Sequence, residues 1–321
     1  MRYLGKSFKI GVLFFAIGLF KKVVVADSLA PFANDIFSFA ARPGYEISSN
    51  DAWLGALAYS LQLYFDFSGY SDMAIGLGRM FGFHLPLNFN SPYKARSIID
   101  FWRRWHITLS SFFRTYVYYP LGGNRHGLVR QIACIVVVFF LTGLWHGAAW
   151  SFVVWGLAHG ALVIINNLWN KATADFLRVI TVEFPSFRKL YDFFAWCLTI
   201  FFVTLLWVLF RAESLEVALK IIDAMLHPWR SAGRVFPDSN VYFPLGIALI
   251  GLNLWCWIAP NTKELICFCR PSVFVQVRFV SVKGICLNFK PWVYACFVGV
   301  ALYSALTSIG YVRSQFIYFN F

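Results

Sequence analysis

A run of forty residues, 131–170, contains no Asp, Glu, Lys or Arg. A helix needs about 20 mostly apolar residues to cross a bilayer, so this run is long enough for two spanning helices joined by a tight turn. The whole chain is 59% hydrophobic and only 13% charged, which a water-soluble domain of 321 residues could not bury. The sequence therefore predicts a membrane protein.

Further apolar runs predict that the chain enters the membrane several times. These runs lie at 9–26, 52–67, 190–210, 241–259 and 292–309, with a shorter piece at 73–83. Together with the charge-free run they predict about seven or eight membrane-embedded segments. We expect an all-α polytopic membrane protein with a single membrane-embedded domain over residues 1–321.

Basic residues gather between Lys94 and Arg130, where seven Lys or Arg side chains accompany one acid, Asp100. The positive-inside rule predicts that this segment is cytoplasmic. The net charge of +13 fits attraction to anionic lipid headgroups, and nucleic acid is a poor partner for this composition. The seven cysteines form no CxxC pair, so we expect neither a metal site nor a disulfide framework.

Aromatic residues and arginines interleave in IIDFWRRWHITLSSFFRTYVYYPLGGNRHG, residues 98–127. At helical spacing Phe101, Trp105, Phe112 and Tyr116 form one apolar stripe, which is typical of an interfacial or re-entrant helix. Two interpretations follow. The helix lies on the membrane surface, or its arginines form a cationic vestibule for an anionic cytoplasmic donor such as a phosphate-bearing thioester.

Two carboxylates, Asp66 and Asp72, stand at the end of an apolar run in FDFSGYSD. Carboxylates at membrane depth are costly, so they should face a basic partner, a polar cavity or unwound backbone. Gly69 lies between them and is a natural break in the helix that would let both side chains point inward. We favour structural pairing with Arg79 or a later arginine over direct catalysis.

His146 lies within the charge-free run, in LTGLWHGAAW. Gly143 and Gly147 leave its imidazole open to close approach by a ligand or by another backbone, and Trp145 and Trp150 offer aromatic walls. Imidazole is the usual base near neutral pH, and no GxSxG or other covalent-nucleophile motif occurs. His146 therefore acts as a base on an acceptor hydroxyl, or it only makes a hydrogen bond to a neighbouring helix.

Four segments resemble the membrane-bound O-acyltransferase family, in the branch that contains the membrane subunit of alginate O-acetylation. They are FDFSGYSDMAIGLGRMFGF, NFNSPYKARSIIDFWRRWHITLSSFFR, YPLGGNR and GLWHGAAWSFVVWGLAHG. The resemblance implies a ring of transmembrane and re-entrant helices around a central funnel. Members of this family usually carry several more helices before the segment at which this chain begins, so we expect the chain to lack N-terminal helices that its relatives have.

The resemblance also assigns roles to residues. It places the catalytic histidine at His146 and the second family histidine at His106. His146 would take the proton of an acceptor hydroxyl, or would carry acyl transfer through a protein intermediate. The other expected site residues are those for donor binding, Arg103, Arg104 and Trp105, and those in supporting positions, Asp66, Asp72, Trp145 and His159.

The implied function is that of a membrane O-acyltransferase, which passes an acetyl group across the membrane for O-acetylation of an exported or cell-surface polysaccharide. Acetyl-CoA or another acyl thioester would be the cytoplasmic donor, with no bound cofactor. A separate periplasmic or extracellular acetyltransferase would be the partner, and the location would be the bacterial inner membrane, with several passes. The alternative is a non-catalytic transporter, or a lipid or polysaccharide-export scaffold, whose intramembrane polar residues mark a pathway.

Overall fold

The computed structural model describes residues 2–229, 235, 241–268, 299, 303 and 307, and every regular element within them is helical. The all-α prediction is therefore confirmed. The described residues fall into two compact units. The first unit contains the described residues within Met1–Ser28, Tyr64–Leu87 and Ile258–Ile317. The second contains the described residues within Leu29–Leu63 and Asn88–Trp257.

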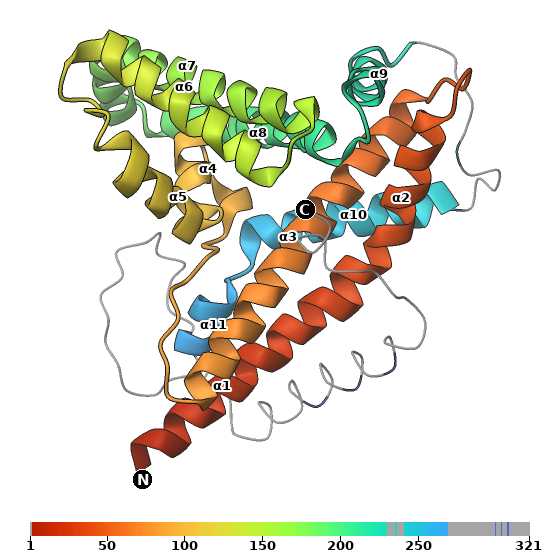
Figure 1. Ribbon diagram of the computed structural model, residues 1–321, viewed down its shortest axis with the longest axis vertical. Helices are drawn as coiled ribbons and strands as arrows, with labels where there is room; N and C mark the ends of the chain where they lie inside the picture. Colours follow the sequence, from red (N-terminus) through yellow and green to blue (C-terminus); the bar gives the residue numbers. More distant parts are fainter. Residues whose placement is uncertain are drawn as a thin grey trace. The chain divides into compact units, whose positions relative to one another are not determined.

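The first unit is built on two helices that approach unusually closely. They are α1 (Arg2–Phe20), which is followed by the π-helical turn η1 (Lys21–Ala26), and the C-terminal part of α3 (Ser49–Met80) (Figure 1). A Cβ on Gly11 would lie 2.6 Å from the carbonyl oxygen of Gly76, and a Cβ on Gly18 would lie 2.5 Å from that of Gly69. Glycine at these positions is therefore what allows the two backbones to touch.

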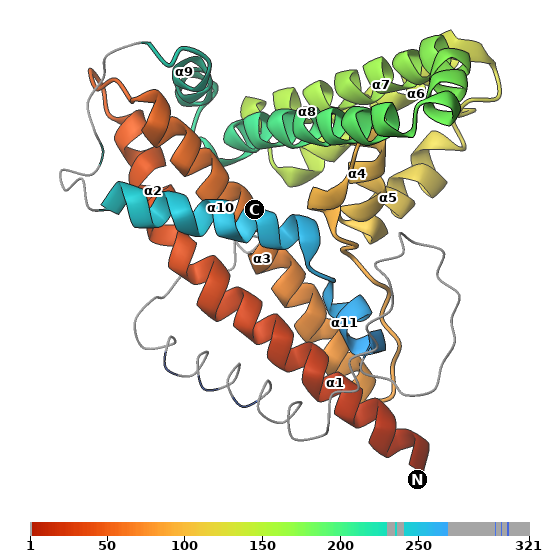
Figure 2. The same cartoon turned by 180° about the vertical axis from the view of Figure 1, so that it is seen from behind.

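A short helix, α11 (Thr262–Phe268), packs on α1 in the first unit, as Figures 1 and 2 show. Its start is a capping box. The side-chain oxygen of Asn261 accepts from the Glu264 backbone N–H at 2.9 Å, and the Glu264 carboxylate accepts from the Asn261 backbone N–H at 3.0 Å. These two bonds satisfy backbone donors that a helix start leaves unpaired.

The second unit contains the remaining helices. They are most of α2 (Asp27–Ala41), the N-terminal part of α3, α4 (Ile98–Arg104), α5 (Ile107–Phe113), α6 (Gly127–His146), α7 (Trp150–Glu183), α8 (Pro185–Arg211), α9 (Leu215–Leu226) and α10 (Tyr242–Ile258), with the short helices η2 (Pro92–Lys94) and η3 (Arg114–Tyr118). The helices α6 and α7 form an antiparallel hairpin, and α8 packs on α7 (Figure 1). The hairpin closes tightly at Gly156, where a Cβ would overlap the carbonyl oxygen of Phe139.

Three helices in the described part of the chain are long and apolar enough to cross a membrane: Gly127–His146, Trp150–Leu177 and Ser186–Arg211. The first two are the hairpin predicted from the charge-free run. The shorter α10 falls below the spanning length. The predicted segment 292–309 lies outside the described residues, and the total of about seven or eight segments stays a prediction.

The segment 98–118 is not one helix, so the predicted apolar stripe is wrong. The helix α4 starts at Ser97, whose side chain accepts from the Asp100 backbone N–H at 3.1 Å, and ends before Trp105. His106 then adopts a left-handed conformation, with φ 42° and ψ 58°, before α5 begins. The break separates buried Phe101 and Trp105 from exposed Phe112 and Tyr116.

The core of the second unit is made of stacked rings. Trp207 packs 4.9 Å from Trp105 and 5.9 Å from Trp155, measured between ring centroids. Phe101 stacks on Trp105 at 5.6 Å and on His159 at 6.4 Å. All five side chains are at most 2% exposed, so α4, α7 and α8 are held together by aromatic packing.

Candidate active site

His146 is the last residue of α6 and is only 4% exposed. Its ring lies between aromatic side chains from three helices: Trp145 at 4.9 Å, Trp155 at 5.1 Å and Phe210 at 5.0 Å, all between centroids. The prediction that Trp150 forms a wall is wrong, because that side chain is 74% exposed. An imidazole among such rings is shielded from bulk water, and in its neutral form it can still take a proton.

The glycines beside His146 serve the protein's own packing. A Cβ on Gly143 would lie 2.5 Å from the carbonyl oxygen of Phe152, and a Cβ on Gly147 would lie 2.7 Å from the Phe152 ring. The sequence predicts that a ligand or another backbone approaches closely at these glycines. At Gly143 the structure places the backbone of α7. The turn that ends α6 at His146 therefore depends on small residues on both sides of the imidazole.

His106 occupies the turn between α4 and α5 and is 9% exposed. Its Nδ1 lies 3.2 Å from the side-chain oxygen of Asn88. That same oxygen accepts from the backbone N–H of Thr108 at 3.2 Å and from the Thr108 hydroxyl at 2.8 Å. Burial lowers the pKa of His106 to about 4, so its imidazole is neutral at physiological pH.

The two histidines come together at one end of the α6–α7 hairpin. The ring of Trp145 contacts both of them, with its centroid 6.1 Å from that of His106 and 4.9 Å from that of His146. Two residues that are forty positions apart in the sequence thus form one histidine pair with an indole against both rings.

The expected donor-binding residues differ in their surroundings. Arg103 is exposed. Arg104 donates from Nε to Oδ1 of Asp100 at 2.9 Å and from its terminal nitrogen to the Asn90 carbonyl at 3.3 Å. Trp105 is 2% exposed and packs among the core rings. The charge of Arg103 is thus exposed, whereas Trp105 belongs to the buried aromatic packing. Donor binding by these three residues stays a prediction.

His159 lies in the aromatic core rather than in the histidine pair. It is fully buried, and its Nδ1 accepts a hydrogen bond from Nε1 of Trp102 at 3.3 Å. The ring of Trp155 lies 5.0 Å from that of His159 and 5.1 Å from that of His146. The supporting role expected of His159 stays a prediction.

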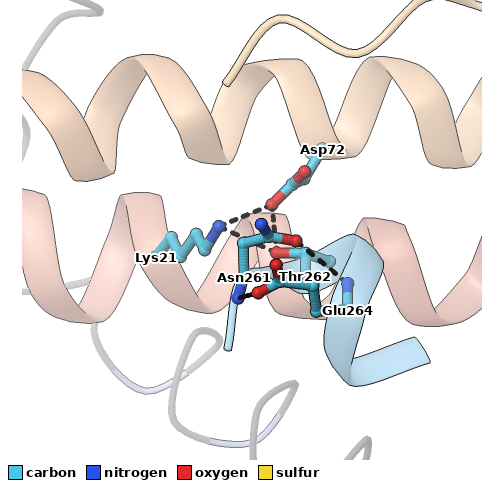
Figure 3. A network of polar contacts seen from close by, with 5 residues as sticks. All are labelled: Lys21, Asp72, Asn261, Thr262 and Glu264. Carbon is cyan, nitrogen blue, oxygen red and sulfur yellow. Dashed lines mark hydrogen bonds and ion pairs between the residues drawn. The ribbon is translucent and has the colours of Figure 1, made fainter. Parts of the chain in front are cut away.

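The two aspartates belong to the first unit, where both pair with lysines. Nζ of Lys21 lies 2.7 Å from the Asp72 carboxylate (Figure 3). Nζ of Lys22 lies 2.6 Å from that of Asp66 and 2.7 Å from that of Asp27. The expected structural pairing is present, but the expected arginine partners are wrong. Lysines take their place because η1 projects both side chains toward carboxylates.

A third group completes the Lys21 pair. The Thr262 hydroxyl donates to the Asp72 carboxylate at 2.6 Å and accepts from Lys21 at 2.8 Å (Figure 3).

The predicted helix break at Gly69 is also wrong, because α3 runs unbroken from Ser49 to Met80. Gly69 instead allows the close approach of Gly18.

Asn88 and Thr108 were not predicted as site residues. They lie within NFNSPYKARSIIDFWRRWHITLS, but no spacing rule links an asparagine to a histidine eighteen positions later. The link is made by chain topology. The Ile107 N–H donates to the Asn88 carbonyl at 3.0 Å, and the Asn90 N–H donates to the Arg104 carbonyl at 3.0 Å. These bonds join the loop 88–90 to the turn that carries His106.

The helical hairpin contains a charge-free run of forty residues, and its first helix ends at the buried His146. With the second histidine, His106, beside it, this arrangement defines a membrane protein with a two-histidine site suited to proton transfer. Comparison with known sequences then gives the family. The model of the membrane-bound O-acyltransferase family matches residues 1–208. The chain belongs to the membrane-bound O-acyltransferase family.

The curated relatives act on different polymers. The chain is 48% identical over 221 residues to the peptidoglycan O-acetyltransferase of Helicobacter pylori, which covers 69% of this chain and 39% of the relative. It is 45% identical over 219 residues to the probable alginate O-acetylase AlgI of Azotobacter vinelandii, 68% of this chain and 40% of the relative. It is 36% identical over 123 residues to the teichoic acid D-alanyltransferase of Bacillus subtilis, 35% of this chain and 31% of the relative.

The chain spans about two fifths of the length of the first two of these relatives. The matched family segment contains both histidines of the pair, the four expected supporting residues and the arginines of α4. The sequence-based identification of the family is therefore confirmed.

Proposed function

We propose that this chain forms the reaction centre of a membrane O-acyltransferase that transfers an acetyl group from a cytoplasmic thioester for O-acetylation of an exported or cell-surface polysaccharide. The observation that carries the proposal is the pair of His146 and His106 against the Trp145 ring. Such a pair can accept and return a proton within an aromatic enclosure. Membership of the family and the O-acetyltransferases among the relatives support the same reaction class.

The proposed reaction moves one proton. An acceptor hydroxyl oxygen attacks the carbonyl carbon of the thioester, a C–O bond forms, and the C–S bond breaks. His146 takes the hydroxyl proton during the attack and returns it to the sulfur of the departing thiolate. Imidazole suits this role because it can hold the proton between the two steps.

The donor in this proposal is acetyl-CoA or a chemically similar acyl thioester, which arrives from the side that bears the basic segment 94–130. The exposed guanidinium of Arg103 would attract its phosphates. Arg104 is already engaged by Asp100, so its role would be to hold the turn that carries His106.

A separate periplasmic or extracellular acetyltransferase would complete the transfer to sugar, and the protein would reside in the bacterial inner membrane with several passes.

The test is acetylation of surface glycan in a bacterial host that lacks its own membrane O-acetyltransferase and keeps the soluble partners. The host would express this chain, His146→Gln, His106→Gln, or the matched control His126→Gln, which alters an exposed histidine of the same unit. We expect glycan-bound acetate with the chain and the control, and a loss of at least about 100-fold with His146→Gln, in line with removal of a general base.

Glutamine keeps hydrogen-bonding capacity but cannot act as the base. Equal acetylation by the chain and by His146→Gln, at equal membrane abundance, would overturn the proposal. So would the absence of acetylation both from this chain and from an N-terminally extended version of it, with both well expressed. Either result would favour the transporter or scaffold alternative. Separate analysis of peptidoglycan and of secreted polysaccharide in the same cells would identify the acceptor polymer.

A further inference from the structure

The side chain of Asn88 is the centre of a hydrogen-bond cluster around His106. Its oxygen receives the Thr108 backbone N–H, the Thr108 hydroxyl and Nδ1 of His106, at 3.2, 2.8 and 3.2 Å. A backbone N–H can only donate, so the Asn88 atom that faces Thr108 must be the carbonyl oxygen and not the amide nitrogen. The orientation of this carboxamide is therefore determined by chemistry.

This orientation decides where His106 carries its proton. An amide oxygen can only accept, so Nδ1 of His106 must be the donor in the contact between them. In a neutral imidazole only one nitrogen is protonated, and the lone pair is then on Nε2. The low pKa of His106, about 4 because of burial, keeps the ring neutral, so the choice of tautomer is meaningful at physiological pH.

The backbone around His106 is held by the same loop. His106 is one of two residues other than glycine with positive φ in the described ranges 2–229 and 241–268. Strained backbone of this kind persists only where the surroundings enforce it, and it is frequent at functional sites. The backbone carbonyl of Asn88 accepts from the Ile107 N–H at 3.0 Å, so Asn88 binds the turn through both its main chain and its side chain.

We propose that Asn88 is a positioning residue for the transfer reaction: by holding the proton of His106 on Nδ1, it makes Nε2 the nitrogen that accepts a hydrogen bond or a proton from the reacting groups. The inference rests on the proposed function and extends it, because it assigns a tautomer and a reacting atom to the second histidine. Asn88 acts through His106 and is not itself in contact with the reacting atoms.

The charged and titratable groups described around His106 come from α4 and α6. On α6, the titratable His146 lies against the same Trp145 ring as His106. On α4, Arg104 is paired with Asp100. Its other described neighbours, Thr108 on α5 and the Trp145 ring, are uncharged. A change of charge at residue 88 should therefore be felt directly in the titration of His106.

The test compares two substitutions that differ in what they offer to Nδ1. Asn88→Leu removes the acceptor, so we expect acetyl transfer to fall by about 10–100-fold, the range known for hydrogen-bond partners that orient metal-binding histidines. Asn88→Asp keeps an acceptor and adds a negative charge that stabilises the imidazolium. We expect near-normal transfer at alkaline pH and an acid limb of the pH–rate profile displaced to higher pH. Asn124→Asp, at an exposed asparagine of the same unit, is the matched control and should leave the profile unchanged.

A purely structural role makes a different prediction. Both Asn88 variants would then lose activity only in proportion to their loss of folded protein, with an unchanged pH–rate profile, and that result would overturn the inference. That result differs from failure of the proposed function. If the proposed function holds, the wild-type chain transfers acetyl groups and His146→Gln abolishes the transfer, whatever the Asn88 variants show.

A readout without catalysis decides the matter if the chain transfers no acetyl group. The ¹⁵N chemical shifts of His106, measured in bilayers with His106→Gln for assignment, report which ring nitrogen carries the proton. We expect a protonated Nδ1 in the wild type and a mixture of tautomers in Asn88→Leu. A wild-type ring protonated on Nε2 would overturn the inference irrespective of activity.

Discussion

The carbonyl oxygen of Gly69 lies 2.5 Å from the position that a Cβ on Gly18 would occupy, and the converse distance, from a Cβ on Gly69 to the carbonyl oxygen of Gly18, is 2.7 Å. Real Cβ atoms essentially never lie this close to a backbone atom. The approach also brings α1 and η1 close enough to α3 for Lys21 and Lys22 to reach Asp72 and Asp66. Tight glycine packing and buried ion pairs in the first unit are therefore parts of one arrangement.

Gly18→Leu should separate these helices and destabilise the protein by at least about 1–3 kcal/mol, because overpacking against backbone cannot be relieved by side-chain rotation. Thermal unfolding of purified protein in detergent measures the effect. The matched control is Gly251→Ala on α10, where an added Cβ meets nothing within 4 Å. The control should be neutral or slightly stabilising, since alanine favours helix. Similar melting temperatures for both variants would show that the close contact is not required.

Lys22→Met should be more damaging than loss of a surface ion pair. The substitution leaves the carboxylates of Asp27 and Asp66, which are 5% and 1% exposed, without their shared cation, and removing one partner of a buried pair costs about 3–5 kcal/mol. Arg96→Met is the comparison. Arg96 pairs with Asp192 but its side chain is 53% exposed, so about 0–1 kcal/mol is expected there. Equal losses in a denaturation experiment would contradict the buried-pair interpretation.

The hairpin was predictable because its signal is local. Forty residues without an acidic or basic side chain define two spanning helices, and the structure ends α6 at His146 and starts α7 at Trp150. The sequence also places His146 and its neighbour Trp145 in this hairpin, and catalysis by His146 stays a prediction. The residues that enclose the imidazole were not, because Trp155 and Phe210 reach it from other helices.

The break at His106 was not predictable from periodicity. Aromatic residues at helical spacing favour one continuous helix, and the backbone instead turns because the loop 88–90 offers hydrogen bonds to residues 104 and 107. Such long-range bonds override a local pattern. The lysine partners of Asp66 and Asp72 were missed for a related reason: they depend on the π-helical register of η1, which no sequence spacing reports.

His159→Leu should lower stability without changing the chemistry of the histidine pair. The substitution removes the acceptor of the Trp102 indole N–H and leaves that donor buried, at a cost of about 1–3 kcal/mol. Trp102→Phe removes the donor as well, so the double variant should recover part of the loss in a double-mutant cycle. Acetyl transfer per folded molecule should remain within a few-fold of wild type, as expected of a supporting residue. A loss as large as that of His146→Gln would instead place His159 in the reaction.

The titration of His106 should make stability depend on pH. Its pKa is lowered to about 4 in the folded protein by burial, against about 6.5 when unfolded. Below pH 6.5 the unfolded chain binds a proton that the folded chain does not, so stability is complete above that pH and falls progressively toward pH 4. The difference of about 2.5 pKa units corresponds to roughly 3 kcal/mol at the acid end.

The measurement is the free energy of unfolding from pH 8 to pH 4 for wild type and for His106→Gln, which lacks the titrating group. Relative to His106→Gln, the free energy of unfolding of the wild type should fall by this amount between pH 6.5 and 4. Parallel curves would show that His106 is not buried as a neutral imidazole.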